Sequence, residues 1–389
     1  MRILQIIDSF SYGGAERLLA TLNGVAPAVG LDMTVASLSP FTEERTASLP
    51  VLDAAGLQPS FVGVRKLLDP KGIPLLTKAI KASGCEVVHA HLGTSATLVP
   101  IAARIAGVPC ISTLHHLPKP KTGKGDRLKS WLCIRSAERG HSLVFVSDAA
   151  RHAAEGIYGP ARPSWRTLHN GVDISAFSPV AGGVPEPLPA DIDVPAGAPV
   201  VSIVAAVREP KGHEYAFTAW ETVRQKVPGA TLLVVGDGPH LPTLRARAGA
   251  GIVFTGARED VPAILRGSTL ALLPSLTEAL PTSLIEAAAS GLAVVATTVG
   301  GTPEVVEHGE TGILVEPRDA DGLAAGLIDL LIDSGRRERY GSAGRRLAED
   351  RFDLRRWAGR LADLYSEAAT KSRPGTKSGA ATATPELRT

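Results

Sequence analysis

Aromatic residues are scarce in this chain of 389 residues: four tryptophans, five tyrosines and eight phenylalanines make up 4% of it. Proteins that bind single-stranded nucleic acid without sequence preference stack the bases on aromatic side chains. A chain with so few of these side chains lacks the means for such stacking. We therefore expect that nucleic acid is not a partner of this protein.

Cysteines and long apolar runs are also rare. The three cysteines, Cys85, Cys110 and Cys133, are scattered without the spacing of metal ligands, and we expect reduced, mostly buried thiols. No apolar run approaches the ~18 residues that span a membrane. The opening residues MRILQIIDSF lead directly into a strand pattern, which predicts no signal peptide. We expect a cytoplasmic protein whose contact with a membrane, where it has one, is peripheral.

The remaining composition is that of a globular protein. Hydrophobic residues make up 44% and charged residues 21% of the chain, which is long enough for two or more domains. Strand-like runs alternate with helix-like segments, a pattern typical of α/β domains with doubly wound parallel sheets. The strand-like runs are residues 2–8, 32–38, 59–64, 86–91, 109–114, 142–147, 164–169, 199–206, 230–236, 251–255, 270–274, 293–298 and 312–315. The helix-like segments include residues 71–83, 93–106, 125–139, 212–227, 239–248, 260–267, 282–290, 319–334, 336–349 and 354–369.

A break in this alternation predicts the domain boundaries. The stretch SPVAGGVPEPLPADIDVPAGAP is rich in proline and glycine, as interdomain linkers are. The end of the chain is of low complexity, and we expect it to be disordered. The predicted parts are a first Rossmann-like domain at 1–175, a linker at 176–198, a second Rossmann-like domain at 199–352, a helix at 353–369 and a disordered tail at 370–389.

The stretch from Ser275 to Gly301 carries the strongest candidate site. Glu278 and Glu286 stand eight positions apart, with Glu278 just before and Glu286 inside a helix that starts near Pro281. The first N–H groups of such a helix favour an anion such as a phosphate. A carboxylate more than a turn inside the helix suits a bidentate hydrogen bond to the vicinal hydroxyls of a ribose. The alternative is a surface helix with two solvated acids.

This stretch resembles the C-terminal signature of the family-4 retaining glycosyltransferases, in the form PS-x-x-E-A-L-P-x-x-L-x-E-A. Four more elements, GGAER, TLHH, NGVD and PKG, follow the family's order along residues 1–368. The resemblance implies the GT-B fold, in which two Rossmann-like domains face each other across a cleft. It also implies transfer of a hexosyl residue from a nucleotide-diphosphate sugar to an acceptor hydroxyl, with retention of configuration.

The resemblance further implies the roles of residues in the second domain. Glu286 would bind the ribose, and Glu278 would hold the hydroxyls of the sugar. Lys211 matches the lysine of the family's R-x4-K-G element, whereas Ala206 stands at the arginine position and Arg208 is the nearest substitute. Fixed cations there would stabilise the leaving diphosphate. The residues expected to bind the donor are Gly13, Gly14, Arg208, Lys211, Gly256, Arg258, Glu278, Ala279, Leu280, Pro281, Thr282 and Glu286, with alanine at 279 where the family has glycine. Arg258 has two open interpretations, a place over the nucleobase or an ion pair with Asp260.

Histidines and aspartates supply the other candidates. By resemblance, His115 lies near the transferring sugar. Together with Glu278, Lys211 and Arg208, it completes the expected catalytic set. His116 is a weaker candidate. His89 and His91 alternate along a strand and point to one face, and we expect a packing or cleft-edge role. Asp191 and Asp193 form D-x-D inside the linker and are interpreted as solvated charges, so that neither a metal nor any cofactor besides the co-substrate is expected.

The partners implied are a UDP- or GDP-sugar donor and a lipid-linked or saccharide acceptor, as in the synthesis of cell-surface polysaccharides or glycolipids. Residues 1–175 hold 19 Lys/Arg against 13 Asp/Glu, with the excess near 119–139. A basic helix there suits an anionic membrane surface, or is simply a solvated face. Two alternative functions stay open: a nucleotide-sugar 2-epimerase of the same architecture, and a catalytically degenerate sugar-nucleotide-binding homologue.

Overall fold

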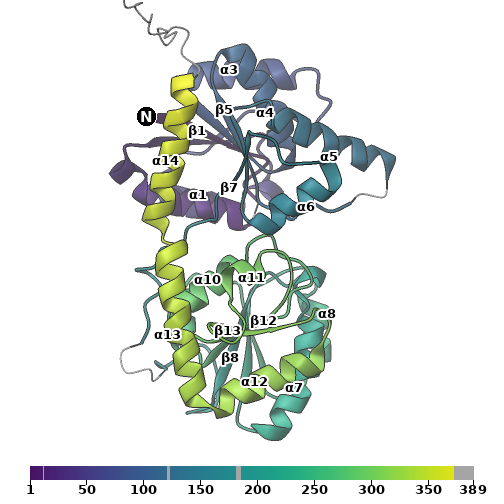
Figure 1. Cartoon of the computed structure of the whole chain (residues 1–389), viewed down its shortest axis with the longest axis vertical. Helices are drawn as coiled ribbons and strands as arrows, with labels where there is room; N and C mark the ends of the chain where they lie inside the picture. Colours follow the sequence, from purple (N-terminus) through teal and green to yellow (C-terminus); the bar gives the residue numbers. More distant parts are fainter. Residues whose placement is uncertain (12, 121–122, 181–184, 372–389) are drawn as a thin grey trace, which may run out of the picture.

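The structure, a computed structural model, describes residues 1–11, 13–120, 123–180 and 185–371. It contains two parallel β-sheets, each in its own lobe, with helices on both faces (Figure 1). The predicted α/β class with two doubly wound parallel sheets is confirmed. Lys121, which belongs to the basic stretch, and all of the predicted tail beyond Lys371 lie outside the described residues.

The first sheet has seven strands in the order β3-β2-β1-β4-β5-β6-β7. Its strands are β1 (Arg2–Ile7), β2 (Asp32–Ser37), β3 (Ser60–Phe61), β4 (Val87–His91), β5 (Cys110–Leu114), β6 (Ser142–Phe145) and β7 (Trp165–Thr167). The second sheet has six strands in the order β10-β9-β8-β11-β12-β13. Its strands are β8 (Val200–Val204), β9 (Thr231–Val235), β10 (Ile252–Gly256), β11 (Leu270–Leu273), β12 (Val294–Thr297) and β13 (Gly312–Val315).

Helices connect the strands in the predicted alternation. In the first lobe these are α1 (Gly14–Val25), η1 (Ala26–Val29), η2 (Glu43–Arg45), α2 (Leu49–Ala54), α3 (Gly72–Ser83), α4 (Gly93–Ala106), α5 (Lys124–Ala137) and α6 (Asp148–Tyr158). In the second lobe they are η4 (Glu209–Lys211), α7 (His213–Lys226), α8 (Leu241–Arg247), α9 (Val261–Arg266), α10 (Thr282–Ala289), α11 (Thr302–Val305) and α12 (Ala320–Ile332). Two long helices follow, α13 (Ser334–Arg351) and α14 (Leu354–Lys371).

The two faces of the first sheet have separate cores because alternate side chains of a strand point to opposite faces. In β1, Ile3 and Ile7 pack with α1 and α14, whereas Leu4 and Ile6 pack with α3 and α4. The second sheet is covered in the same way, by α10 and α13 on one face and by α7 and α12 on the other. In both lobes the polar loops gather at the carboxyl edge of a buried sheet, where open α/β folds bind ligands.

The last helix returns to the first lobe. In Figure 1, α13 lies along the second lobe and α14 along the first. Trp357, Leu361 and Tyr365 of α14 are part of the core that contains β1 and β4. At the crossing the N–H of Val172 donates to the carbonyl of Phe352 at 2.8 Å. The two lobes are thus joined by two chain crossings.

The proline-rich stretch is more than the linker that its composition predicted. Leu188, Ile192 and Val194 pack against strands β8 to β10 and α9, and only 7% of Ile192 is exposed. Glu186 adds a backbone hydrogen bond and an ion pair to Arg266. This half of the stretch belongs to the second lobe because its few apolar residues pack on the surface formed by β8 to β10 and α9.

Three further expectations from the sequence can be compared with the structure. All three cysteines are free and buried, as predicted. Among the helices of the described chain, none has both the length and the apolar character needed to cross a lipid bilayer. Thr370 and Lys371, which were assigned to the tail, form the last residues of α14.

Candidate functional site

Lys211 and Glu278, which sequence analysis placed in one site, form an ion pair. The Nζ atom of Lys211 lies 2.7 Å from Oε1 of Glu278, and the hydroxyl of Ser275 donates to the same oxygen at 2.6 Å. Glu278 is buried, with 8% of its surface exposed. Both donors bind Oε1, so within the described residues Oε2 keeps its lone pairs for a further donor.

Glycines hold the loops of this pair against each other. Gly212, next to Lys211, has φ +65°, and a Cβ atom there would lie 2.0 Å from the carbonyl oxygen of Pro274. Gly300 has φ +50°, and its Cβ would lie 1.8 Å from the carbonyl oxygen of Glu278. Only glycine combines this left-handed backbone with so close an approach. The loop containing Glu278 is therefore enclosed on both sides by backbone.

The loop continues into the short helix α10, as predicted. Ala279, Leu280 and Pro281 are buried, and the helix begins at Thr282. Pro281 is the N-cap and makes no side-chain capping bond. The first backbone N–H groups of α10 therefore remain available to an anion beside the Lys211–Glu278 pair.

Glu286 lies one turn further along α10 and faces the first domain. Burial raises the pKa of its carboxyl to about 7, and the positive charge of Arg17 on α1 opposes this shift. Arg17 also donates from Nη2 to the carbonyl oxygen of Arg258 at 3.5 Å. Arg17 thus reaches from the first domain into the expected nucleotide site. The sequence element GGAER contains this arginine but predicts no role for it, because its partners lie in the other domain.

Arg258 makes the ion pair with Asp260 that was one of its two interpretations. Its Nε and Nη2 atoms donate to Asp260 at 2.8 and 2.7 Å, and its guanidinium also binds Asp191. Asp191 and Asp193 are both exposed, in keeping with their interpretation as solvated charges, but Asp191 also forms an ion pair with Arg258 that its sequence context did not predict. The fork of an arginine matches a carboxylate in a bidentate manner. This pair ties the proline-rich stretch to the loop after β10, where Gly256 ends the strand with φ +73°.

Arg208 does not join this group. Its side chain is exposed, and in the part of the chain that the structure describes it has no hydrogen bond or ion pair. Ala206, two residues after the end of β8, is half-buried. The structure therefore brings Lys211 and Glu278 together but leaves Arg208 outside their contacts.

The first domain contributes Gly13, Gly14 and His115. Gly13 is the N-cap of α1, and a Cβ atom on it would lie 2.6 Å from a carboxylate oxygen of Glu16. Burial raises the pKa of Glu16 to about 7. His115 follows β5, and burial lowers the pKa of its imidazole to about 4, with a smaller contribution from His116. His115 is therefore neutral near pH 7.

Glu304, which sequence analysis missed, connects the two domains. Its carboxylate accepts from the N–H groups of Asp148 and Ala149 at 2.9 and 2.8 Å, at the start of α6. His169 Nε2 lies 2.6 Å from the same carboxylate. Burial alone would raise the pKa of Glu304, but these hydrogen bonds bring it below its usual value. One ligand atom each of Asp148, His169 and Glu304 lies within 4.8 Å of the others, yet the N–H donors already occupy Glu304, and we assign no metal there.

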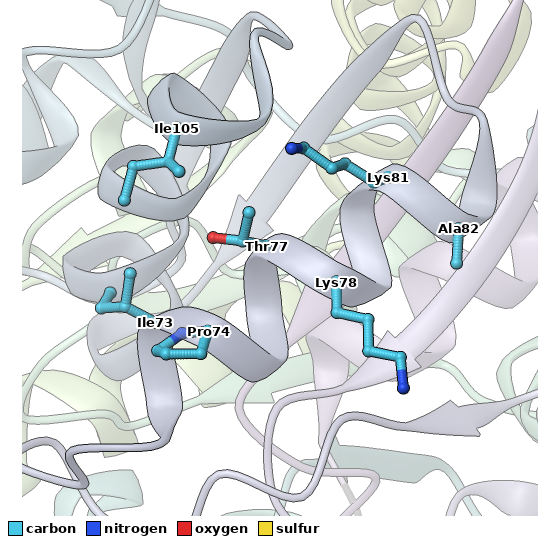
Figure 2. A pocket seen from close by; sticks show the side chains of 7 residues that line it. All are labelled: Ile73, Pro74, Thr77, Lys78, Lys81, Ala82 and Ile105. Carbon is cyan, nitrogen blue, oxygen red and sulfur yellow. The ribbon is translucent and has the colours of Figure 1, made fainter.

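The described residues of the first domain line two larger hollows, besides a small one of about 10 Å³ beside His115. One of about 370 Å³ is at the carboxyl edge of the sheet and is lined by Asp8, Leu67, Gly93, Thr94, Thr97, Leu114, His116, Leu117, Pro118, Lys119, Lys129, Ser130, Cys133, Ile134 and Tyr158. The other, of about 660 Å³, lies between α3 and α4 and is lined by Ile73, Pro74, Thr77, Lys78, Lys81, Ala82 and Ile105 (Figure 2). Lys81 and Ile105 stand near the ends of helices that lead into the amino ends of β4 and β5. The second hollow therefore lies away from the site.

Comparison with known families decides the assignment of the chain. The family described as Glycosyltransferase Family 4 matches residues 12–176, and Glycosyl transferases group 1 matches residues 198–333. The chain belongs to the family-4, group 1 glycosyltransferases. The two matches correspond to the two lobes, and the remaining residues include the proline-rich stretch, α13 and α14.

Individual relatives of this glycosyltransferase carry several activities. The alpha-maltose-1-phosphate synthase of Mycolicibacterium smegmatis is 28% identical over 312 residues, which are 73% of this chain and 79% of that protein. A GDP-mannose-dependent alpha-(1-6)-phosphatidylinositol monomannoside mannosyltransferase of Mycobacterium tuberculosis is 33% identical over 236 residues, 57% of this chain and 60% of that protein. These names are those of transferases and synthases and do not favour the epimerase alternative.

A solved structure with the same fold is that of HepE from Anabaena in complex with UDP and glucose. It has a TM-score of 0.77 at 22% identity and covers 94% of this chain and 99% of that one. The sucrose-phosphate synthase of Thermosynechococcus elongatus has a TM-score of 0.73 at 19% identity, covering 95% and 100% of the two chains. The GT-B fold is thereby confirmed.

Proposed function

We propose that this glycosyltransferase moves a hexosyl residue from a nucleotide-diphosphate sugar to an acceptor hydroxyl, with retention of configuration and without a metal. The observation that carries the proposal is the ion pair of half-buried Lys211 with buried Glu278, beside the N-terminus of α10, which has no side-chain cap. A cation and helix N–H groups together suit a diphosphate. The UDP and GDP-mannose named for relatives support this class of donor.

In the proposed complex, the ribose hydroxyls bind Glu286 and the diphosphate binds Lys211. Oε2 of Glu278 accepts a hydrogen bond from a hydroxyl of the sugar, while Lys211 holds Oε1. A second cation, Arg208 or Arg17, completes the neutralisation of the diphosphate. Charge grows on the leaving diphosphate in the transition state, so fixed cations there lower the barrier. The leaving phosphate takes the proton of the attacking acceptor hydroxyl on the same face of the sugar.

The acceptor is proposed to bind in the first domain, in the hollow of about 370 Å³ at the carboxyl edge of the sheet. Lys119 and Lys129 line this hollow together with Leu117 and Ile134. Leu128 and Trp131 of the basic helix α5 are exposed nearby in sequence. This combination of cations and apolar groups suits a lipid-linked acceptor at an anionic membrane surface. Retention of the protein by liposomes with anionic lipid, lost at high salt, would support peripheral contact; no retention at low salt would refute it.

A thermal-shift panel of UDP- and GDP-sugars tests the proposed donor class. A donor at 100 times its Kd should stabilise the protein by about 2.7 kcal/mol. Glu286→Gln should reduce the shift, and it serves as the control for binding at this site. If no nucleotide sugar stabilises the protein, the proposal fails. Stabilisation without turnover across an acceptor panel would instead support the sugar-nucleotide-binding homologue.

A further inference from the structure

A row of polar side chains crosses the first sheet beneath α14. Gln5 of β1 pairs in register with His89 of β4, and His91 pairs with Thr113 of β5. These alternate positions point to the face that α14 covers. Gln5, His89 and His91 are all buried. Buried polar groups need hydrogen-bond partners, and here they find them in one another.

The hydrogen bonds form a continuous chain from Tyr365 of α14 to His115 after β5. The hydroxyl of Tyr365 lies 3.0 Å from Nε2 of Gln5 and 2.7 Å from Nδ1 of His89. His89 Nε2 lies 2.7 Å from the hydroxyl of Thr113. On the other side, Oε1 of Gln5 lies 2.7 Å from Nε2 of His91. His91 Nδ1 then lies 2.9 Å from Nε2 of His115, the last member.

The amide of Gln5 gives this chain a direction. An amide nitrogen only donates and an amide oxygen only accepts. Nε2 of Gln5 therefore donates to Tyr365, which leaves the hydroxyl proton of Tyr365 available to Nδ1 of His89. The reverse orientation of the amide would reverse every bond in the chain. Nε2 also contacts Sδ of Met33 at 3.8 Å, and a thioether sulfur accepts but never donates a hydrogen bond. Met33 thus favours the orientation found.

The direction of hydrogen-bond donation along this chain determines which nitrogen of His115 carries the proton. Oε1 of Gln5 accepts, so Nε2 of His91 carries the proton and Nδ1 of His91 is the acceptor. His115 must then donate from its own Nε2. Burial lowers the pKa of His91 well below its usual value and that of His115 to about 4. Both rings are neutral near pH 7, and a neutral imidazole carries one proton. Nδ1 of His115 is therefore an acceptor, and no residue in the described ranges is bonded to it.

We propose that Gln5, held by Tyr365 of α14 and by Met33, is a positioning residue that fixes His115 as the Nε2–H tautomer. Nδ1 of His115 then accepts a hydrogen bond from a hydroxyl of the donor sugar and cannot donate one. This last step rests on the proposed function, whereas the tautomer itself does not. The role of α14 is thus to orient a residue of the site along the face of the sheet that the helix covers.

The tautomers are measured by two-bond ¹H–¹⁵N NMR of histidine-labelled protein, with His115→Asn to assign the His115 signal. The wild type should show an unprotonated Nδ1 and a protonated Nε2 at His115. In Gln5→Leu and in the milder Tyr365→Phe the direction is no longer imposed, and both tautomers should be populated. Leu361→Ala is the matched control, because it removes packing of α14 at a buried position that has no polar partner. It should lower Tm without changing the tautomer.

Each outcome has one meaning. An unchanged tautomer of His115 in both Gln5→Leu and Tyr365→Phe would overturn the proposal. A change of the tautomer in Leu361→Ala as large as in these variants would also overturn it, because it would show that packing of α14, and not the hydrogen bonds of Gln5, fixes the tautomer. With a nucleotide sugar that the wild type uses, kcat/KM should fall about tenfold in Tyr365→Phe, as for a lost hydrogen bond. A wild type with the expected tautomer but no activity on any nucleotide sugar would refute the proposed function and leave the tautomer assignment standing.

Discussion

Glu286 makes the stability of the free protein depend on pH. Its pKa of about 7 lies above the ordinary value of 4.5 because burial disfavours the charged carboxylate. The folded protein holds this proton longer than the unfolded chain does, so stability should fall as pH rises from about 4.5 to about 7. Glu286→Gln should abolish this loss and raise the free energy of unfolding at pH 8 by about 1–3 kcal/mol. Urea titrations of the wild type and of Glu286→Gln at pH 5 and pH 8 measure these free energies of unfolding.

The exposed acid Glu310 provides the control for this prediction. Glu310→Gln should leave the difference between the two pH values unchanged. A Glu286→Gln variant that is no more stable than the wild type at pH 8 would contradict the assignment. Lower nucleotide affinity in the same variant would link the stability cost of Glu286 to its function, since a binding group is often kept where it destabilises the fold.

Lys211→Ala should lower kcat by about 10²–10³, because it removes a fixed cation from the leaving group. Removal also leaves Glu278 buried without its ion pair, which costs stability. Ser275→Ala is the matched control, since it removes only the neutral donor to the same oxygen. Single-turnover kinetics separate the chemical step from stability. Normal turnover in Lys211→Ala would exclude this role.

Arg17 and Arg208 are alternative second cations at the diphosphate. We expect Arg17→Ala to weaken binding of UDP or GDP relative to the corresponding nucleoside by about tenfold or more, as for a charged hydrogen bond. Arg208→Ala should change this ratio less, because Arg208 is exposed and lies outside the contacts of the site. Isothermal titration of nucleoside and diphosphate measures the ratio. The opposite ranking would assign the role to Arg208.

The family's motifs predicted which residues share a site, whereas partners outside these motifs could not be predicted. Glu278 and Lys211 stand in two separate motifs, 67 positions apart, and the resemblance placed them in one site; nothing in either motif indicated that Ser275 would bind the same oxygen. The partners of Arg17, Gln5 and Glu304 lie in other elements, and Gln5 and Tyr365 are 360 positions apart. Spacing along the chain cannot indicate such pairs.

At the scale of elements, the alternation of apolar runs and helix formers predicted strands and helices within a few residues of their observed ends. Buried strands such as β9 and β12 are continuous apolar or β-branched runs, which mark them clearly. The proline-rich stretch was less predictable. Its few apolar residues, Leu188, Ile192 and Val194, have no helical or strand period, yet they cover the edge of the second sheet.

The glycine turn after β12 offers a test at this scale. Gly300→Ala places a Cβ atom against the carbonyl of Glu278 at a positive φ, and the loop must move. We expect a loss of more than about 1 kcal/mol in stability together with lower activity. Gly359→Ala in α14 is the control, since nothing lies within 4 Å of its Cβ position; it should be neutral or stabilising by up to ~1 kcal/mol. Full activity in Gly300→Ala would show that the loop tolerates displacement.

At the scale of the whole molecule, Glu304 holds the lobes at one relative orientation. Its carboxylate caps α6 of the first domain and binds His169. The lowered pKa of Glu304 means that this contribution is present above about pH 4.5 and is lost as pH falls further. Glu304→Gln keeps the size of the side chain but loses the charge. We expect a larger radius of gyration by X-ray scattering at pH 7, with secondary structure unchanged.

The control for this scattering experiment is the substitution of an acid that lies outside the contact between the lobes. Glu310→Gln serves again, and its scattering should match that of the wild type. The wild type itself should approach the Glu304→Gln profile as the pH is lowered further below 4.5, the ordinary pKa of a glutamate. An unchanged radius in Glu304→Gln would show that the two chain crossings alone fix the orientation of the lobes.

The return of α14 to the first lobe has a consequence for how the protein is made. The ribosome completes the strands of the first sheet early, but the core that contains β1 lacks Trp357, Leu361 and Tyr365 until the last helix emerges. The second sheet, by contrast, closes within residues 200–315. During synthesis the second lobe can therefore finish folding before the first, in reverse of the order of translation. A chain still in synthesis exposes apolar surface on its N-terminal lobe, which is synthesised first, and a chaperone would be needed longest there.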